Sequence, residues 1–350
     1  MDRTIFAVSR LVALFFAALF VVAAALFLTA FIARRQLLRP APYKEALRQV
    51  NAYERAPQIL SGILADALND SQERDSVAGL FLNLIPSDYE IMLNQLLPEQ
   101  WLERQVEAII DQSFAGMEGG NPGSPITISL LAIKDNLRGQ AGSQALLAVI
   151  ETRPTCAPGD LRTLTCGIDV QSGISCQPPA AQLQLCATAL NAVLVGTTSL
   201  IPDTVEFSTL LQAVQPVAQS VSDVLHPYNL VLRPVARFGW IFLPVFLLLL
   251  TLFAVRSLRD WLRWWGLSVL GVGIVLLPVA LLTWLSPAWF FAGPISELRS
   301  WQPALGQLAA DVVSVLGRRM ALQLAFAAGG LGALGVIMGL ISFLLPARQR

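Results

Sequence analysis

Four stretches of the chain are long and apolar enough to cross a lipid bilayer, which takes about 20 residues of helix. They cover residues 11–33, 238–255, 267–285 and 322–345, and none of them contains a charged residue. In hydrocarbon every backbone polar group must find a partner within its own segment, so these stretches are expected to be helices. The sequence therefore predicts an all-α integral membrane protein with four transmembrane helices.

The composition supports this fold class. Charged residues make up only 14% of the chain, against about 25% in soluble proteins, and the mean hydropathy is +0.59. Six tryptophans lie at or near the ends of the predicted spans, as an interfacial aromatic belt requires. They are Trp240, Trp261, Trp264, Trp265, Trp284 and Trp289.

The predicted spans divide the rest of the chain into segments of very different size. These are a tail (1–10), a large segment (34–237), a turn (256–266), a loop (286–321) and a second tail (346–350). Four crossings place both tails and the turn on one side, where they amount to only 26 residues. That is too few for a nucleotide-binding or kinase domain. We therefore expect a protein that neither powers transport nor relays a signal alone.

The cysteines indicate the side of the membrane that the large segment occupies. Basic residues give conflicting evidence: seven lie on the tail side, and ten lie near span ends or in the loop on the other. Cysteines stand at Cys156, Cys166, Cys176 and Cys186, without a C-x-x-C motif and without a histidine within 35 residues. Two disulfides in an oxidising compartment are the simplest interpretation. This predicts a cell-membrane protein with a disulfide-stapled, extracytoplasmic segment 34–237 and cytoplasmic termini.

The cysteine spacing leaves the disulfide pairing open. Two C-x-P-x7-C motifs follow each other 20 residues apart. Their spacing resembles the twin C-x9-C pattern of coiled-coil-helix hairpin proteins over residues 156–186 only, which indicates a shared geometry and not kinship. If both motifs are helical, the bonds run between them, because ten helical residues separate two cysteines too far. An antiparallel pair joins 156 to 186 and 166 to 176, and a parallel pair joins 156 to 176 and 166 to 186.

Most of the large segment is predicted to be helical. Residues 42–68 have apolar positions near the 3.6-residue period, with a kink or break at Pro57. Ser87 and Glu90 fit a capping box that opens a helix to residue 96, and Pro98 opens another over 99–114. Residues 126–133 fit either a short strand or the start of a helix. Further helices are expected over 143–150, 179–195 and 204–225.

The large segment is acidic. Between Asp66 and Asp223 it carries 18 acidic and 6 basic residues, which disfavours nucleic acid as a partner. Glu99, Glu103, Glu107 and Asp111 follow one another every four residues and form a stripe along one helix. Like charges at this spacing repel, so a basic partner or a divalent cation is one interpretation. The other is a solvated helix face.

The last predicted span has one side made of small residues. Ala328, Gly332, Gly335 and Gly339 include two pairs at the four-residue spacing that allows close helix contact. The partner helix belongs either to this chain or to another protein. In the loop 286–321, apolar residues trace a helical stripe that is expected to lie on the membrane surface or under the large domain. They are Ile295, Leu298, Leu305, Leu308, Val312 and Val315.

No pattern in the chain indicates catalysis. The sequence has no nucleophile elbow, phosphate loop or dinucleotide fingerprint, and its only histidine, His226, cannot make a site that needs two. His226 beside Asp223 could act as a base, but no nucleophile accompanies it. The predicted spans contain no charge, which disfavours a pump. We therefore predict no enzymatic activity, no cofactor and no metal.

The function expected from these features is protein interaction. The leading hypothesis is an accessory or assembly subunit of a membrane complex, whose extracytoplasmic domain binds another membrane or envelope protein. The alternative is a carrier of lipid or another hydrophobic ligand, with its cavity between the exterior helices and the outer leaflet. A membrane-embedded enzyme built around His226 is a third. Membrane lipid is an expected partner in each case.

Overall fold

The computed structural model divides into two compact units, each of which is described by itself. The bundle unit comprises Met1–Ala46, Gln219–Glu297 and Ala309–Arg350, and the disulfide unit comprises Leu47–Ala218 and Leu298–Leu308. The structure describes residues 2–70, 84–97, 99–117, 127–157, 168–169, 173–198, 203–206, 234–235, 238–253, 255, 257–286, 296, 299 and 303–345.

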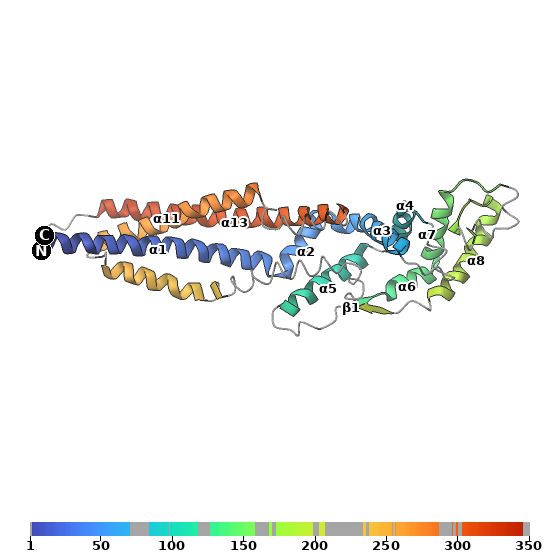
Figure 1. The fold of residues 1–350 in the computed structure, drawn as a ribbon, viewed down its shortest axis with the longest axis horizontal. Coiled ribbons are helices and arrows are strands. Elements are labelled where there is room, and N and C mark those ends of the chain that lie inside the picture. The colour runs from blue at the N-terminus through green and yellow to red at the C-terminus, as the bar shows by residue number, and fades with distance from the viewer. Residues whose placement is uncertain are drawn as a thin grey trace. The chain divides into compact units, whose positions relative to one another are not determined.

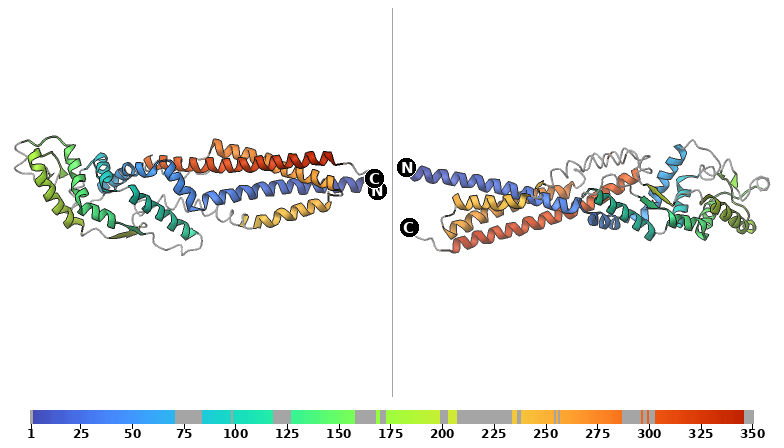
Figure 2. Two further views of the ribbon diagram at one scale, coloured as in Figure 1. Left: turned by 180° about the vertical axis from the view of Figure 1, so that it is seen from behind. Right: turned by 90° about the horizontal axis from the view of Figure 1, so that it is seen from below.

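Long apolar helices make up the bundle unit (Figures 1 and 2). Among the described residues, three helices are long and apolar enough to cross a membrane: α1 (Asp2–Leu37), α11 (Leu258–Leu285) and α13 (Pro303–Leu344). They contain three of the four predicted spans. The fourth predicted span coincides with a shorter apolar helix, Phe238–Phe253. The start of α1 and the end of α13 lie at the same end of the bundle (Figure 1).

Most of the predicted turn 256–266 is helical, because α11 already begins at Leu258. Its first turn is capped by Ser257, whose hydroxyl accepts a hydrogen bond from the Asp260 N–H at 3.2 Å. The same hydroxyl donates to the Asp260 carboxylate at 2.9 Å. The cap satisfies one of the free backbone donors at the helix start, which stabilises a helix that begins here.

The apolar stripe predicted in the loop 286–321 is helical from Pro303 onward, but it belongs to α13 and not to a helix that ends before the last span. Helix α13 runs without interruption from Pro303 to Leu344, and no proline occurs inside it to stop propagation. Leu305, Leu308, Val312 and Val315 therefore lie on the same helix as the last span. Ile295 and Leu298 lie outside the described residues. At 1.5 Å per residue, 42 residues reach about 60 Å, twice the thickness of the hydrocarbon layer.

The described part of the disulfide unit is mostly helical (Figure 1) and contains two very small antiparallel sheets. Its helices are α3 (Ala52–Asp70), α4 (Pro86–Leu96), α5 (Glu99–Met117), α6 (Leu131–Arg138), α7 (Gln140–Glu151), α8 (Ala180–Thr198) and the end of α2 (Pro40–Gln49). Strand β1 (Thr127–Ser129) pairs with β4 (Thr204–Glu206), and β2 (Ile168–Asp169) pairs with β3 (Gly173–Ile174).

The expected helix over residues 42–68 is broken at a different place from the one predicted. Helix α2 ends at Gln49 and α3 starts at Ala52, and Asn51 between them has a φ of 50°. This left-handed conformation is one that asparagine tolerates better than most residues, and it ends a helix. Pro57 instead lies inside α3.

Two other predicted elements need correction. Helix α4 opens with Pro86 in its first turn, and the Ile85 N–H donates to the Asp88 carboxylate at 3.0 Å, so the predicted Ser87–Glu90 pair is not the cap. Residues 126–133 contain both expected elements, strand β1 and then the start of α6. Where a helix was expected over 204–225, the chain begins with strand β4, and residues 207–225 lie outside the described residues.

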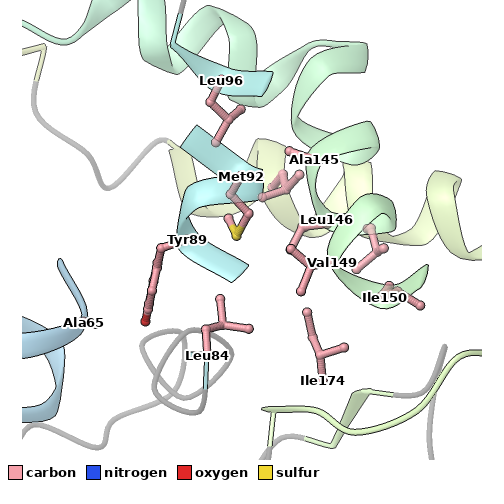
Figure 3. Close-up of a cluster of buried hydrophobic side chains, with 12 residues drawn as sticks. Ala65, Leu84, Tyr89, Met92, Leu96, Ala145, Leu146, Val149, Ile150 and Ile174 are labelled. Atoms are coloured by element: carbon pink, nitrogen blue, oxygen red, sulfur yellow. The ribbon is translucent and has the colours of Figure 1, made fainter. Parts of the chain in front are cut away.

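The core of the disulfide unit lies between α4 and α7 (Figure 3). Met92 and Leu96 of α4 pack with Leu146 and Val149 of α7, as their 3.6-residue spacing requires. Other elements close the cluster through Ala65, Leu84, Tyr89, Ala145, Ile150, Ile174, Leu190 and Leu194. Because Leu190 and Leu194 belong to α8, this core determines which face of α8 is left outside.

Candidate functional site

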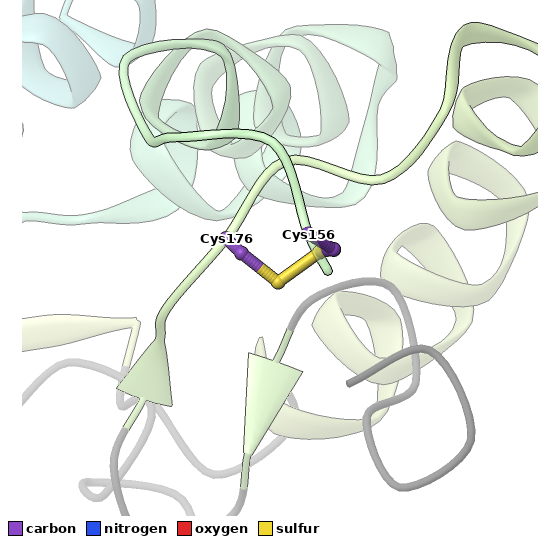
Figure 4. Close-up of a disulfide and its surroundings, with 2 residues drawn as sticks. All are labelled: Cys156 and Cys176. Carbon is purple, nitrogen blue, oxygen red and sulfur yellow. A yellow bond between two sulfur atoms is a disulfide. The ribbon is translucent and has the colours of Figure 1, made fainter. Parts of the chain in front are cut away.

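The disulfide Cys156–Cys176 joins two extended segments that lie between α7 and α8 (Figure 4). The Cys156 N–H donates to the Gln177 carbonyl at 2.9 Å, and the Gln177 N–H donates to the Pro154 carbonyl at 2.8 Å. A parallel bridge between Thr155 and Gln177 completes this pairing. The bond belongs to the parallel alternative and excludes the antiparallel one.

Cys156 and Cys176 do not lie on helices, so the condition of two helical motifs is not met. Prolines follow both of them closely, and a residue that precedes proline is driven into extended conformations. Cys186 does lie on a helix, α8, where it is buried and also disulfide-bonded. Cys166 lies outside the described residues.

The acidic stripe of α5 meets a basic partner within the chain. Arg48 of α2 donates from Nε to the Glu103 carboxylate at 2.7 Å and from Nη2 to the Glu107 carboxylate at 2.6 Å. The buried side chain of Tyr53 lies beside these charges, and burial together with Glu107 and Glu103 raises its pKa. The positive charge of Arg48 therefore offsets the repulsion between Glu103 and Glu107.

The stripe has two further members, Glu99 and Asp111. Asp111 is exposed, and the side chain of Glu99 lies outside the described residues. In the part of the chain that the structure describes, no three histidine, cysteine or acidic side chains come together in a group able to hold a metal. His226 lies outside the described residues as well.

Two further ion pairs brace the disulfide unit. The buried carboxylate of Asp88, at 2% side-chain exposure, accepts a hydrogen bond from Arg153, which follows α7. Lys134 of α6 donates to the carboxylate of Asp203, and this contact lowers the pKa of Asp203. Each pair connects a helix to a residue that is distant in the sequence. We therefore assign both pairs to the stability of the unit and not to a binding site.

Helix α8 presents the most unusual surface of the disulfide unit. It contains no charged residue, and its exposed side carries an apolar row that we call the α8 stripe. Leu185 is 78% exposed and Val195 is 46% exposed. The full stripe consists of Ala181, Leu185, Ala189, Ala192 and Val195. A helix that faces only water normally carries charges on its outer side, so this face is suited to contact with another apolar surface.

A sequence signal for the α8 stripe exists but is easily missed. Between Asp169 and Asp203 the chain has no charged residue, in the middle of a segment with 18 acidic residues. The alternation of apolar and polar residues that identifies amphipathic helices is weak here, because apolar residues lie on the exposed side of α8 as well as on its buried side. The absence of charge is therefore more informative than the periodicity.

The small residues of α13 pack against α11 within the bundle unit. A Cβ atom at Gly335 would lie 2.7 Å from the Gly266 carbonyl oxygen, and one at Gly273 would lie 2.8 Å from the Ala328 carbonyl oxygen. A Cβ at Gly266 would lie 3.2 Å from the Gly339 nitrogen, and one at Gly273 would lie 3.0 Å from the Gly332 nitrogen. All four small residues of the predicted row thus approach α11 of the same chain. Sequence reasoning missed the partner glycines on α11, which are spaced seven residues apart.

A cavity of about 610 Å³ lies between α1 and the helix Phe238–Phe253. Its walls are almost entirely apolar, and Thr29, its one polar lining residue, donates its hydroxyl to the Ala25 carbonyl at 2.8 Å. We call it the α1 groove. It is lined by Ala23, Leu26, Phe27, Thr29, Ala30, Pro234, Val235, Phe238, Gly239, Phe242 and Phe246.

No family model, curated protein or solved structure matches the chain. Function is therefore argued from two features of the structure, the α8 stripe and the α1 groove.

Proposed function

We propose that this is a non-catalytic, multi-pass membrane protein whose disulfide unit binds another membrane or envelope protein, as an accessory or assembly subunit of a complex. The observation that carries the proposal is the α8 stripe. Leu185 and Val195 expose apolar side chains on a helix without charge, in a unit that is otherwise acidic. Covering such a face removes apolar area from water, which is the main driving force of protein association.

The buried contacts behind the stripe make it a rigid surface. Leu190 and Leu194, on the opposite side of α8, belong to the core, and the buried Thr198 accepts a hydrogen bond from Arg138 Nε at 2.9 Å. A surface that is already ordered pays little conformational entropy on binding. This favours a stable subunit contact over a transient encounter.

Four crossings of the membrane are part of the proposal. The helix Phe238–Phe253 has 16 residues, about 24 Å, which is slightly short for a bilayer. It runs antiparallel to α1: Phe253 stacks on Phe16 at 5.8 Å between ring centroids, while Gly239 lies against Phe27. An apolar helix packed in this way along a candidate span supports its being a span itself.

The location of the disulfide unit outside the cytoplasm is also proposed. The disulfide Cys156–Cys176 supports it, because such bonds persist in oxidising compartments. With four spans, both termini are then cytoplasmic. Cysteine labelling in intact cells, at residues introduced into the two tails, tests this arrangement.

The interaction is tested by crosslinking in the native membrane. A photoreactive amino acid at Leu185 is expected to crosslink a stoichiometric protein partner, and the same group at Gln184 is not. Gln184 is exposed on the same helix but points about 100° away from Leu185. In gently solubilised protein, Leu185→Arg should remove the partner from the native mass spectrum, and Gln184→Arg should retain it. A partner that is insensitive to Leu185→Arg, or a chain without a partner, contradicts the proposal.

A lipid or hydrophobic-ligand carrier is the second candidate, and the α1 groove is the observation that favours it. A carrier must release its ligand, so transfer of lipid between donor and acceptor vesicles distinguishes it from an anchor that merely holds lipid. His226→Ala tests the third candidate, an enzyme, because loss of a catalytic base abolishes activity without changing partner binding.

A further inference from the structure

The α1 groove lies close to the C-terminal end of α1, where the last turn contains Arg34 and Arg35. Its lining residues on α1 run from Ala23 to Ala30, in the second half of the apolar stretch Leu11–Leu37. On the opposite wall, Phe238, Phe242 and Phe246 follow one another every four residues and form an aromatic row. The Phe27 ring takes the space that a side chain at position 239 would fill, since a Cβ there would lie 2.1 Å from the ring.

The chemistry of these walls selects an apolar occupant. The groove offers no charge and no free hydroxyl among its described lining residues, so it cannot compensate a buried polar group. Its volume of about 610 Å³ falls within the roughly 300–1,000 Å³ of sites that hold small molecules. In a bilayer, the hydrocarbon chains of lipids surround such a pair of helices and are the available apolar occupant.

Arg34 gives the groove a polar end. Groove residues Ala23, Leu26 and Ala30 lie on one face of α1, and Arg34 stands on the same face, one turn (about 6 Å) beyond Ala30. Arg35 follows it but points about 100° away from that face. Both side chains are exposed. An apolar slot that ends in an arginine matches a molecule with a hydrocarbon chain and an anionic head.

We propose that the α1 groove is a binding site for one anionic phospholipid, with an acyl chain along Ala23–Ala30 and the phosphate at Arg34. Arginine binds phosphate oxygens through charge-assisted hydrogen bonds, and its position at the end of the apolar stretch suits the headgroup level. The site belongs to the bundle unit and does not depend on the protein interaction proposed for the disulfide unit. If the protein is a carrier, this is the lipid that it carries.

Native mass spectrometry of the purified full-length protein tests the site. The protein is equilibrated in mixed micelles with equal amounts of phosphatidylglycerol and phosphatidylcholine, and the lipid that stays bound is identified. We expect one retained lipid with about a fivefold preference for phosphatidylglycerol, the size that one arginine near an anionic headgroup supports. Arg34→Ala should reduce the preference to about one, while Arg35→Ala leaves it unchanged.

The groove itself is tested by filling it. Ala23→Trp should lower retention of both lipids at least tenfold, and Ala23→Leu should lower it by a smaller factor in the same direction. Ala18→Trp is the matched control, because Ala18 is exposed on α1 outside the groove lining. Hydrogen exchange of α1 and α11 verifies that each variant is folded.

Three results would overturn the proposal. The first is that both Ala23 variants, when folded, still retain lipid. The second is that Arg34→Ala and Arg35→Ala change the headgroup preference equally. The third is that a dimer of this chain occupies the groove in place of lipid. Inorganic phosphate at millimolar concentration should not displace the lipid, since the acyl chain supplies most of the contact. Displacement would assign Arg34 to free phosphate instead.

Discussion

The two units of this protein are stabilised by different kinds of contact. In the bundle unit, α11 and α13 approach until backbone meets backbone, with Gly335 and Gly266 in contact where other residues would hold the helices apart. Large side chains form a core in both units, with Phe20, Leu276 and Leu324 in the bundle unit and Met92, Leu146 and Ile150 in the disulfide unit. In the disulfide unit, a disulfide and the largely buried ion pair Asp88–Arg153 also join segments that are distant in the sequence.

The difference corresponds to the solvent proposed for each unit. Lipid tails are as apolar as leucine, so burying leucine between helices gains little there, and close van der Waals packing through glycine takes its place. In water, burial of apolar side chains drives folding, but a unit of this size gains further stability from a covalent link. Substitutions in one unit should consequently leave the other unit unaffected.

The largest effect is expected from Gly335→Leu. Its Cβ would lie 2.7 Å from the Gly266 oxygen and 2.7 Å from the Leu270 nitrogen, and backbone atoms cannot yield as a flexible side chain does. Overpacking of this kind costs about 3 kcal/mol or more. Hydrogen exchange of α11 and α13, followed by mass spectrometry, should increase markedly, while that of α4 and α7 stays the same.

Gly339→Leu is the control for this prediction. Gly339 is the other half of the same four-residue motif, yet a Cβ there would meet nothing within 4 Å. Its effect on exchange should be small. Equal effects of the two substitutions would mean that the motif does not act through contact with α11.

The next largest effect is expected from the double variant Cys156→Ser/Cys176→Ser. The bond closes a loop between residues 20 apart, which corresponds to about 3 kcal/mol of lost chain entropy in the unfolded state. Exchange should rise in α7 and α8 and remain unchanged in α11 and α13. An equal rise in the bundle unit would show that the two units unfold together and would contradict the comparison.

A third prediction concerns the buried pair Asp88–Arg153. Asp88→Ala should destabilise the disulfide unit by about 2–3 kcal/mol, because it leaves the Arg153 charge without its partner. Because Arg153 is 19% exposed, this cost is lower than that of breaking a fully buried ion pair. Asp135→Ala changes an exposed carboxylate in the same unit and should have little effect. Adding Arg153→Leu to Asp88→Ala should restore part of the stability in a denaturant titration, and failure to do so would assign the loss to the cap at Ile85 instead.

Local patterns allowed much of this fold to be predicted from the sequence. Helices α4, α5 and α7 lie close to where apolar periodicity and Pro98 place them, since each has a stop signal or a clear apolar face. Hydropathy detects where a helix is apolar but not where it begins, which is why α13 was expected to be almost 20 residues shorter. Pro57 was expected to kink or break the helix over 42–68, whereas the structure breaks it at Asn51, whose φ of 50° is left-handed.

The candidate surfaces were harder to predict because they depend on residues far apart in the chain. Arg48 meets Glu103 across 55 residues, and no local pattern links the two. The α1 groove joins residues near position 26 with residues near position 242. Gly335 was identifiable from its spacing, whereas its partner on α11 required the structure.

The smallest effect on stability is expected from Asp203→Asn, which removes the exposed carboxylate of the Lys134–Asp203 pair. This effect depends on pH and is lost in acid. The Lys134 ammonium lowers the pKa of Asp203, so the folded state holds this carboxylate in its charged form more firmly than the unfolded chain does. The resulting stabilisation is present above the unfolded-state pKa of about 3.9 and is lost as the pH falls through the lower folded-state value. Asp203 is 63% exposed, so solvent screens the interaction and the contribution is small.

Between pH 6 and pH 3, exchange of α6 and β4 should rise less in Asp203→Asn than in the wild type, with Asp135→Asn as the control. Because the bundle unit contains no part of this pair, exchange of α11 and α13 should follow the same pH dependence in all three proteins, and a difference there would show that the units are coupled after all.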